Sequence, residues 1–486
     1  MELIRRLPWR LILTGLTMLV LVWQLGAAGI FYAKHNWSAI RFEYPVDYAE
    51  GPLLDQAVRL ARFENIYHND LSKPPYTISN YPPLFVLVQV PFVWLFGPAL
   101  WYGRLISTLS MIAAAVFLGL TLYTTTRDRW AGILGGSILL AFPYVLFWSA
   151  LNRIDSLALG LICAGLYVVA RWSKNRKEVI ASAILLSLAV YTRQSYALAA
   201  PLASFVWLLR EPPRRLAIEL AAWTAGLCLG LFLLLNALTR GGFFLNVVTA
   251  NVNPFFWENV KLNATGVFHH LWPFLAGSAL FLVLGRLRAD KTWFLVAPFL
   301  IGAFLSGMTI GKEGSNVNYL LELTAAFSLV AGSFVAWTKS RPFWRGIVLL
   351  ALALQVNNMV LWSKEEYSRK VYGRIAQTSE FSQLKLLIHN ATGPVLVDEH
   401  MALVPLDGRD LFFQPFEYKM LSKAGIWNQR SFVVSILNKE YALILLYAPP
   451  NWNSIEARWT PEQLWAIEYS YVYSGRLANT LICTPR

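Results

Sequence analysis

The sequence predicts a multi-pass α-helical membrane protein of about 11 transmembrane helices with a small C-terminal extracytoplasmic α/β domain. Its 486 residues are 56% hydrophobic and only 14% charged, whereas about 25% of the residues in soluble domains are charged. Long apolar runs recur through residues 1–362, and a helix of ~20 apolar residues is long enough to cross the hydrocarbon core of a bilayer. Lys and Arg cluster between alternate runs, as they do in cytoplasmic loops.

The basic clusters fix the predicted orientation. The predicted cytoplasmic loops hold 18 Lys and Arg, against five in the short outer loops. Because cytoplasmic loops retain positive charge, the net charge of +14 reflects topology, and we expect no nucleic-acid partner. The clusters are Arg5–Arg6–Arg10, Arg127–Arg129, Arg171–Lys174–Arg176–Lys177, Arg210–Arg214–Arg215, Arg286–Arg288–Lys291 and Lys339–Arg341–Arg345.

Residues 1–362 therefore form the predicted transmembrane domain. A polar outer loop spans residues 33–81, and an apolar stretch at 82–97 follows it. That stretch is short for a crossing, and a crossing there would turn every later basic cluster outward, so we predict an interfacial helix on the outer face. The predicted crossings are 11–32, 99–125, 130–149, 156–171, 178–192, 196–210, 216–238, 267–285, 292–310, 318–337 and 343–362.

Residues 363–486 carry charge at an ordinary density and form the predicted extracytoplasmic α/β domain. Residues 379–390 have a helical apolar rhythm and end before Gly-Pro, and short apolar runs at 394–397 and 442–446 indicate strands. Charged side chains are mostly exposed. We therefore expect the isolated acids of this domain at its surface or in turns: Asp398, Glu399, Asp407 and Asp410.

Two acids in the first outer loop are candidates for catalysis. Asp47 and Glu50 are three residues apart, so on one helical turn their carboxylates would share a face. A carboxylate that is partly desolvated at the membrane surface can act as a general base. The alternative is a solvated acidic turn.

A third acid, Asp155, is predicted to lie at an outer membrane end with apolar residues on both sides. Ionised groups at such a depth are costly and usually have a function or a partner. The alternative is a local Arg153–Asp155 pair that stabilises the start of the following helix.

Cationic and amide side chains gather at two other outer ends. Arg193 and Gln194 follow one crossing, and the amide-rich stretch 311–319 follows another. Such donors suit a phosphate diester, because Arg and Lys supply charge-assisted hydrogen bonds, although Arg193 could instead reach lipid head groups by snorkelling. We predict donor-phosphate contacts from Arg193, Lys312, Asn316, Asn318 and Tyr319, and substrate contacts from Tyr81, Arg153 and Gln194.

The order of these features resembles the GT-C superfamily of integral-membrane glycosyltransferases. An apolar helix and an acidic loop precede Tyr81-Pro82-Pro83, a short outer helix, Gly97 and Arg104, and then an Asp at the next outer end. Protein O-mannosyltransferases and bacterial aminoarabinose transferases look most similar. The resemblance covers about residues 1–340, and the C-terminal domain looks like the small extracytoplasmic domain of some members.

The resemblance implies that a sugar leaves a polyprenyl phosphate on the outer face and that a first-loop acid is the base. It places the first acid on Asp47 or Glu50 and the second on Asp155. The common Asp-Glu pair is replaced here by Asp-Tyr-Ala-Glu, which leaves the choice between the first two open.

The expected activity is that of an inverting hexosyl- or pentosyltransferase in a bacterial plasma membrane, with a lipid, glycan or protein hydroxyl as acceptor. The cysteines are scattered and indicate no metal site, while a divalent metal stays open as a cofactor. The alternative function is a transporter or flippase for a polyprenyl-linked glycan. Such a protein typically has broken helices in related halves around a midplane site.

Overall fold

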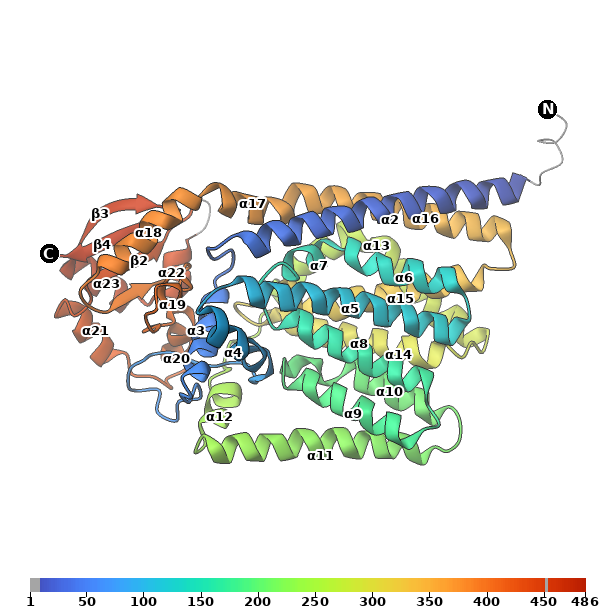
Figure 1. The fold of residues 1–486 in the computed structure, drawn as a ribbon, viewed down its shortest axis with the longest axis horizontal. Coiled ribbons are helices and arrows are strands. Elements are labelled where there is room, and N and C mark those ends of the chain that lie inside the picture. Colours follow the sequence, from blue (N-terminus) through green and yellow to red (C-terminus); the bar gives the residue numbers. More distant parts are fainter. Residues whose placement is uncertain (1–8, 451–452) are drawn as a thin grey trace.

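The computed structural model describes residues 9–450 and 453–486. Long helices run roughly parallel in a bundle, and a smaller α/β domain lies at one end of it (Figure 1). We call this end the domain end and the other the basic end. Arg5 and Arg6 of the first predicted basic cluster lie outside the described residues.

Seven helices among the described residues are long and apolar enough to cross a membrane. The remaining four predicted crossings fall on shorter helices that run alongside the long ones (Figure 1). The predicted fold class is thereby confirmed. The seven are α2 (Trp9–Arg41), α5 (Trp101–Thr126), α11 (Arg215–Leu238), α13 (Trp257–Leu287), Trp293–Gly311 with α14 (Trp293–Gly307), Val317–Trp337 with α15 (Leu321–Trp337), and Pro342–Ala376 with α16 (Pro342–Trp362); the shorter four are α6 (Arg129–Ala141), α8 (Asp155–Arg171), α9 (Arg176–Val190) and α10 (Ala199–Leu209).

One predicted crossing, 130–149, is broken in the structure. Helix α6 ends at Ala141, Phe142 is extended, and α7 (Pro143–Trp148) starts anew. Pro143 lacks the amide hydrogen that would continue α6 and instead suits the first position of a helix. Helix α7 and the residues up to Asp155, where α8 begins, follow this break.

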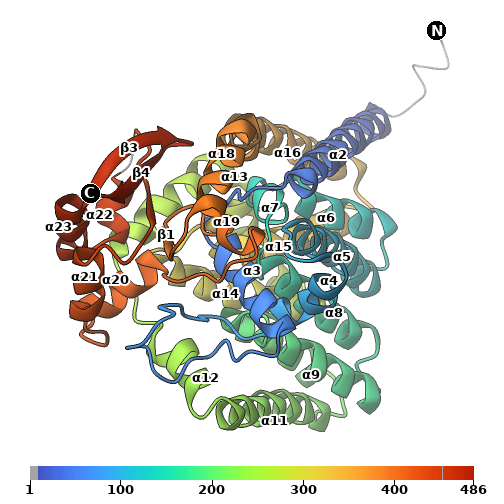
Figure 2. The ribbon, with the colours of Figure 1, turned by 60° about the vertical axis from the view of Figure 1, so that its left-hand side comes forward.

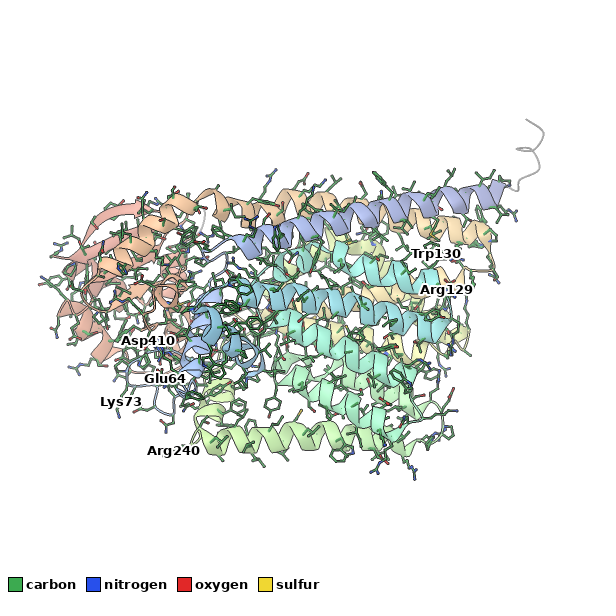
Figure 3. All side chains as sticks on the ribbon, viewed as in Figure 1. Glu64, Lys73, Arg129, Trp130, Arg240 and Asp410 are labelled. Carbon is green, nitrogen blue, oxygen red and sulfur yellow. The ribbon has the colours of Figure 1, made fainter. Side chains whose placement is uncertain are left out.

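The ends of the bundle differ in charge as the sequence predicts. The loops that join α5 to α6, α8 to α9 and α10 to α11 lie at the basic end (Figure 1). Figure 3 places Arg129 at this end and the acids Glu64 and Asp410 toward the domain end, where Lys73 and Arg240 also lie. Loops that alternate along the sequence therefore lie at opposite ends of the bundle, and the loops rich in Lys and Arg share the basic end.

The predicted outer loop 33–81 is partly helical: α2 continues into it as far as Arg41, and α3 (Glu50–Ala61) follows at the domain end. The predicted stretch 82–97 forms α4 (Leu84–Phe96), which packs against α3. Helix α4 has 13 residues, contains Pro91, and exposes Trp94, Leu95 and Phe96. A short helix with an exposed apolar surface suits a membrane interface, and the interfacial position of 82–97 stays a prediction.

The C-terminal domain has one mixed sheet covered by helices. Strand β1 is parallel to β2, and β4 and β3 continue the sheet antiparallel in the order β1-β2-β4-β3. Helix α16 ends at Trp362, at the predicted boundary, but the helical path continues through a π turn (Ser363–Tyr367) and α17 (Ser368–Ala376) to Ala376. The elements are α17 (Ser368–Ala376), α18 (Thr378–Asn390), β1 (Val395–Val397), α19 (Leu403–Leu406), α20 (Pro415–Lys423), α21 (Arg430–Leu437), β2 (Leu443–Tyr447), α22 (Ser454–Arg458), α23 (Pro461–Ser470), β3 (Tyr471–Leu477) and β4 (Thr480–Pro485).

The C-terminal domain packs directly on the first loop, where α19 lies against α3 (Figure 2). The carboxylate of Asp55 accepts a hydrogen bond from the Leu411 amide at 2.9 Å, and Arg59 donates to the Leu411 carbonyl at 3.0 Å. At Gly51 a Cβ atom would lie 2.5 Å from the backbone nitrogen of Ala402. Only glycine permits so close an approach of the two backbones.

Candidate active site

Arg153 joins two of the predicted catalytic acids. It lies between α7 and α8, and its Nη1 is 3.1 Å from Oδ1 of Asp47 while its Nε is 3.6 Å from Oδ2 of Asp155. The guanidinium also lies 5.0 Å from the ring centre of Trp148. Two carboxylates from distant parts of the sequence thus share one buried cation at the domain end.

Asp155 connects this pair to the predicted phosphate-binding residues. It begins α8, is fully buried, and forms an ion pair with Arg193. Asn318 donates its side-chain amide to Asp155 at 2.9 Å, and the guanidinium of Arg193 lies 4.3 Å from the ring centre of Tyr319. Three segments predicted separately from the sequence therefore converge on one cluster.

Tyr81 and Gln194 border this cluster. Burial raises the pKa of Tyr81 to about 12, while the nearby charges of Arg153 and Arg193 act in the opposite direction. Gln194 donates to the carbonyl of Asn80 at 3.1 Å, which ties the segment before α4 to the end of α9.

Glu50 differs from Asp47 in its surroundings. The prediction that the two share a helical face is wrong, because α3 begins only at Glu50 and Asp47 lies in the preceding turn. Arg104 binds both oxygens of Glu50 at 2.8 Å, and the amides of Val46 and Asn152 each donate to it at 2.8 Å. Burial alone would raise the pKa of Glu50, but the Arg104 pair and these amides hold it below its ordinary value.

Asp47 keeps part of its carboxylate open. Its side chain is 21% exposed and bonds only Arg153 and the Ala49 amide among the described residues. Burial raises the pKa of Asp47, the charge of Arg153 lowers it, and the charges of Glu50 and Glu399 raise it further. Of the two first-loop acids, Asp47 is therefore the one available to a substrate.

Two predicted phosphate ligands stand apart from the cluster. The Asn316 side chain is exposed and accepts the Val317 amide at 2.8 Å, which caps a short helix. Lys312 is held through its backbone, which bridges to Phe255. Among residues 9–450 and 453–486, no hydrogen bond or ion pair joins either side chain to Asp155 or Arg193.

The cluster contains buried polar atoms that have no hydrogen-bond partner among the described residues. Buried polar groups are nearly always paired with protein, water or ligand, so a concentration of unpaired donors and acceptors marks a place for a polar ligand. The atoms are Nε of Arg153 and Oδ2 of Asp155, which face each other at 3.6 Å, beyond hydrogen-bond distance, and Oγ of Ser156, Nη2 of Arg193, Oε1 of Gln194 and the hydroxyl of Tyr196.

Arg104 has a place in the site to which the sequence analysis assigned no role. It is fully buried and donates to the carbonyls of Ala39, Phe42 and Tyr44 as well as to Glu50. A charged residue inside an apolar run was the available signal, because such residues are rare in membrane helices.

The residues present fit a divalent metal poorly. The part of the chain that the structure describes contains no group of three or more His, Cys, Asp or Glu side chains that could hold an ion. Asp47 and Asp155 are each paired with an arginine, and a metal would have to displace these cations.

The fold matches solved membrane glycosyltransferases over nearly the whole chain. ArnT from Cupriavidus metallidurans in the apo state aligns with a TM-score of 0.61 at 15% identity, covering 95% of this chain and 97% of ArnT. ArnT bound to undecaprenyl phosphate aligns with a TM-score of 0.58 at 15% identity, covering 98% and 97%. No family model and no curated protein matches the sequence.

A second type of enzyme has the same fold. The archaeal oligosaccharyltransferase AglB from Archaeoglobus fulgidus, in complex with an inhibitory peptide and a dolichol-phosphate, aligns with a TM-score of 0.55 at 12% identity, covering 96% of this chain and 74% of AglB. Both neighbours are GT-C membrane glycosyltransferases. The resemblance expected from the sequence is thus confirmed for the fold.

Proposed function

We propose that this GT-C-fold protein is an inverting glycosyltransferase that moves a sugar from a polyprenyl-phosphate donor to an acceptor hydroxyl. The observation that carries the proposal is the chain of charges Asp47–Arg153–Asp155–Arg193, which is buried except at the partly exposed Asp47. Each arginine has one N–H group without a hydrogen-bond partner among the described residues. The fold of ArnT bound to undecaprenyl phosphate supports a lipid-phosphate donor. A hexose or pentose on that lipid, and a lipid, glycan or protein acceptor, belong to this proposal.

In the proposed reaction Asp47 removes the proton from the acceptor hydroxyl. The acceptor oxygen forms a bond to the anomeric carbon while the bond from that carbon to the phosphate oxygen breaks, through an oxocarbenium-like transition state. Nε of Arg153 and Nη2 of Arg193 donate to the phosphate that leaves with the polyprenyl chain, because preorganised donors stabilise developing charge. Arg153 contacts Asp47 directly, and Asp155 joins Arg153 to Arg193. Inversion, with the base and the departing phosphate on opposite faces of the sugar, belongs to this proposal.

Asp155 and Asn318 hold Arg193 in place for this task. Asp155 is an ion-pair partner, and Asn318 binds both Asp155 through its amide and Arg193 through its carbonyl at 3.3 Å. In many phosphate-transfer sites a divalent metal stabilises the phosphate charge. We propose that the two arginines do so here.

The direct test is sugar release by the purified protein from a panel of polyprenyl-phosphate hexoses and pentoses, with and without a chelator. We expect free polyprenyl phosphate and a glycosylated acceptor, with little effect of the chelator. Movement of an intact glycolipid across proteoliposomes, without cleavage of its phosphate–sugar bond, would instead support the transporter or flippase.

We propose further that the domain end is extracytoplasmic and that the chain resides in a bacterial plasma membrane. The positive-inside rule supports this orientation, since Lys and Arg concentrate in the loops of the basic end. An alkaline phosphatase fused after Arg486 should be active. An inactive fusion, together with a cytoplasmic reporter that works at the same position, would reverse the orientation.

A further inference from the structure

Tyr48 links the proposed base to the C-terminal domain. It follows Asp47 in the sequence, and its hydroxyl donates to Oε2 of Glu417 at 2.9 Å and accepts the Phe416 amide at 3.3 Å. Both partners lie in the first turn of α20. The ring of Tyr48 lies against the guanidinium of Arg458, 4.4 Å from ring centre to Cζ.

Arg458 is itself fixed by buried carboxylates. It contacts Oδ1 of Asp398 and Oε2 of Glu399, both at 2.6 Å, while Arg374 binds the other oxygen of Glu399 at 2.7 Å. Asp398 is fully buried and Glu399 is 9% exposed, so a surface position is wrong for both, whereas the predicted turn is correct: they lie in the bend and turn that follow β1. A buried network whose members are paired is rigid, and here it presents a fixed surface to Tyr48.

Phe416 touches the other half of the site. Gly314 has a φ of +79°, and a Cβ atom there would lie 2.4 Å from the Phe416 ring. Gly314 belongs to the segment that leads to Asn318 and Tyr319, which contact Asp155 and Arg193. The first turn of α20 therefore contacts both the segment of the base and the segment whose Asn318 and Tyr319 hold Arg193.

We propose that Tyr48, Phe416 and Arg458 form a latch through which the C-terminal domain positions the two halves of the active site. The latch rests on the proposed function and extends it: the domain is part of the transferase machinery. All three are positioning residues, because they touch the segments that carry reacting groups and not the reacting groups themselves.

Kinetics should separate the two arms of the latch. Tyr48→Phe keeps the ring on Arg458 but removes both hydroxyl hydrogen bonds, so kcat should fall about 10- to 100-fold, as expected for a displacement of ~1 Å, with the KM for donor unchanged. Phe416→Ala should lower kcat and also raise the donor KM, because it frees the segment around Gly314. The matched control is Arg62→Ala, which breaks an exposed ion pair with Asp410 between the same two regions and should change neither constant.

Hydrogen exchange gives a readout that needs no activity. Tyr48→Phe should speed exchange in residues 43–49 only, and Phe416→Ala should speed it in both 43–49 and 311–319. Unchanged kcat and KM in both variants, even with a lower unfolding temperature, would reduce the latch to a structural contact and overturn the proposal. A wild-type protein that transfers no sugar would overturn the proposed function, while exchange would still show whether the two segments depend on α20.

Discussion

Glu50 and Asp47 are three residues apart and each pairs with an arginine from elsewhere in the bundle, Arg104 and Arg153. The surroundings of the two carboxylates nevertheless differ. Every oxygen of Glu50 is occupied, by Arg104 and by the amides of Val46 and Asn152, and its side chain is inaccessible. Asp47 shares Arg153 with Asp155 and retains 21% exposure. A carboxylate whose hydrogen-bonding capacity is filled holds the fold, whereas one that is only partly bonded can accept a proton.

The same contrast separates the two arginines at the ends of these networks. Arg104 donates to three backbone carbonyls and to both oxygens of Glu50. Arg193 pairs with Asp155 but leaves Nη2 buried without a partner among the described residues. A buried N–H group without a hydrogen-bond partner costs free energy. A substrate anion that accepts a hydrogen bond from Nη2 of Arg193 would remove this cost.

Asp47→Asn should break the reactive site without breaking the fold. The amide keeps the size of the side chain and most of its hydrogen bonding but cannot take a proton, so kcat should fall by ~10² to 10⁴, the usual contribution of a general base. Donor binding, measured by tritiated polyprenyl-phosphate sugar, should persist. Full activity in this variant would remove Asp47 as the base.

Glu50→Gln should destabilise the fold and leave the chemical step intact. Loss of one partner leaves the Arg104 charge buried and uncompensated, a change that costs about 3–5 kcal/mol in buried pairs. The unfolding temperature in detergent should fall sharply, while the fraction that stays folded keeps a kcat close to wild type. A stable Glu50→Gln protein that has lost its activity would exchange the roles assigned to the two acids.

Arg193→Ala tests whether Arg193 stabilises the charge of the departing phosphate. Removal of a donor to developing charge costs about 10² to 10³ in kcat, and Arg193→Lys should recover only part because a point charge does not reproduce the planar fork. Unfolding temperatures of both variants report any cost of leaving Asp155 unpaired. Lys312→Ala is the comparison: with no direct contact to Asp155 or Arg193 in the described residues, it should lose far less than Arg193→Ala.

Much of this arrangement could be predicted from the sequence, because apolar length and loop charge specify which helix ends lie together. Asp155, Arg193 and Asn318 were expected at one face, and the structure brings them into contact. The difference between Asp47 and Glu50 could not be predicted, since it depends on Arg104 reaching across from α5. The latch was equally hidden, because Tyr48 and Glu417 are 369 residues apart.

The pH dependence of kcat/KM should sharpen the comparison further. A base works deprotonated, so activity should decline as pH falls through the pKa of Asp47, which burial holds above the ~3.9 of an exposed aspartate. The charges that face Asp47 are Arg153, which lowers that pKa, and Glu50 and Glu399, which raise it. Arg153→Gln should therefore move the acid limb to higher pH, and Arg153→Lys should leave it nearer to wild type.

Glu399→Gln should shift the acid limb of the pH profile in the opposite direction to Arg153→Gln. Without its negative charge the ionised form of Asp47 is easier to reach, so the acid limb should move to lower pH. Opposite shifts from one cation of the bundle and one carboxylate of the C-terminal domain would identify Asp47 as the titrating group, because Glu50 is shielded by Arg104. Shifts of the same sign, or none in either variant, would mean that the group controlling the acid limb lies elsewhere.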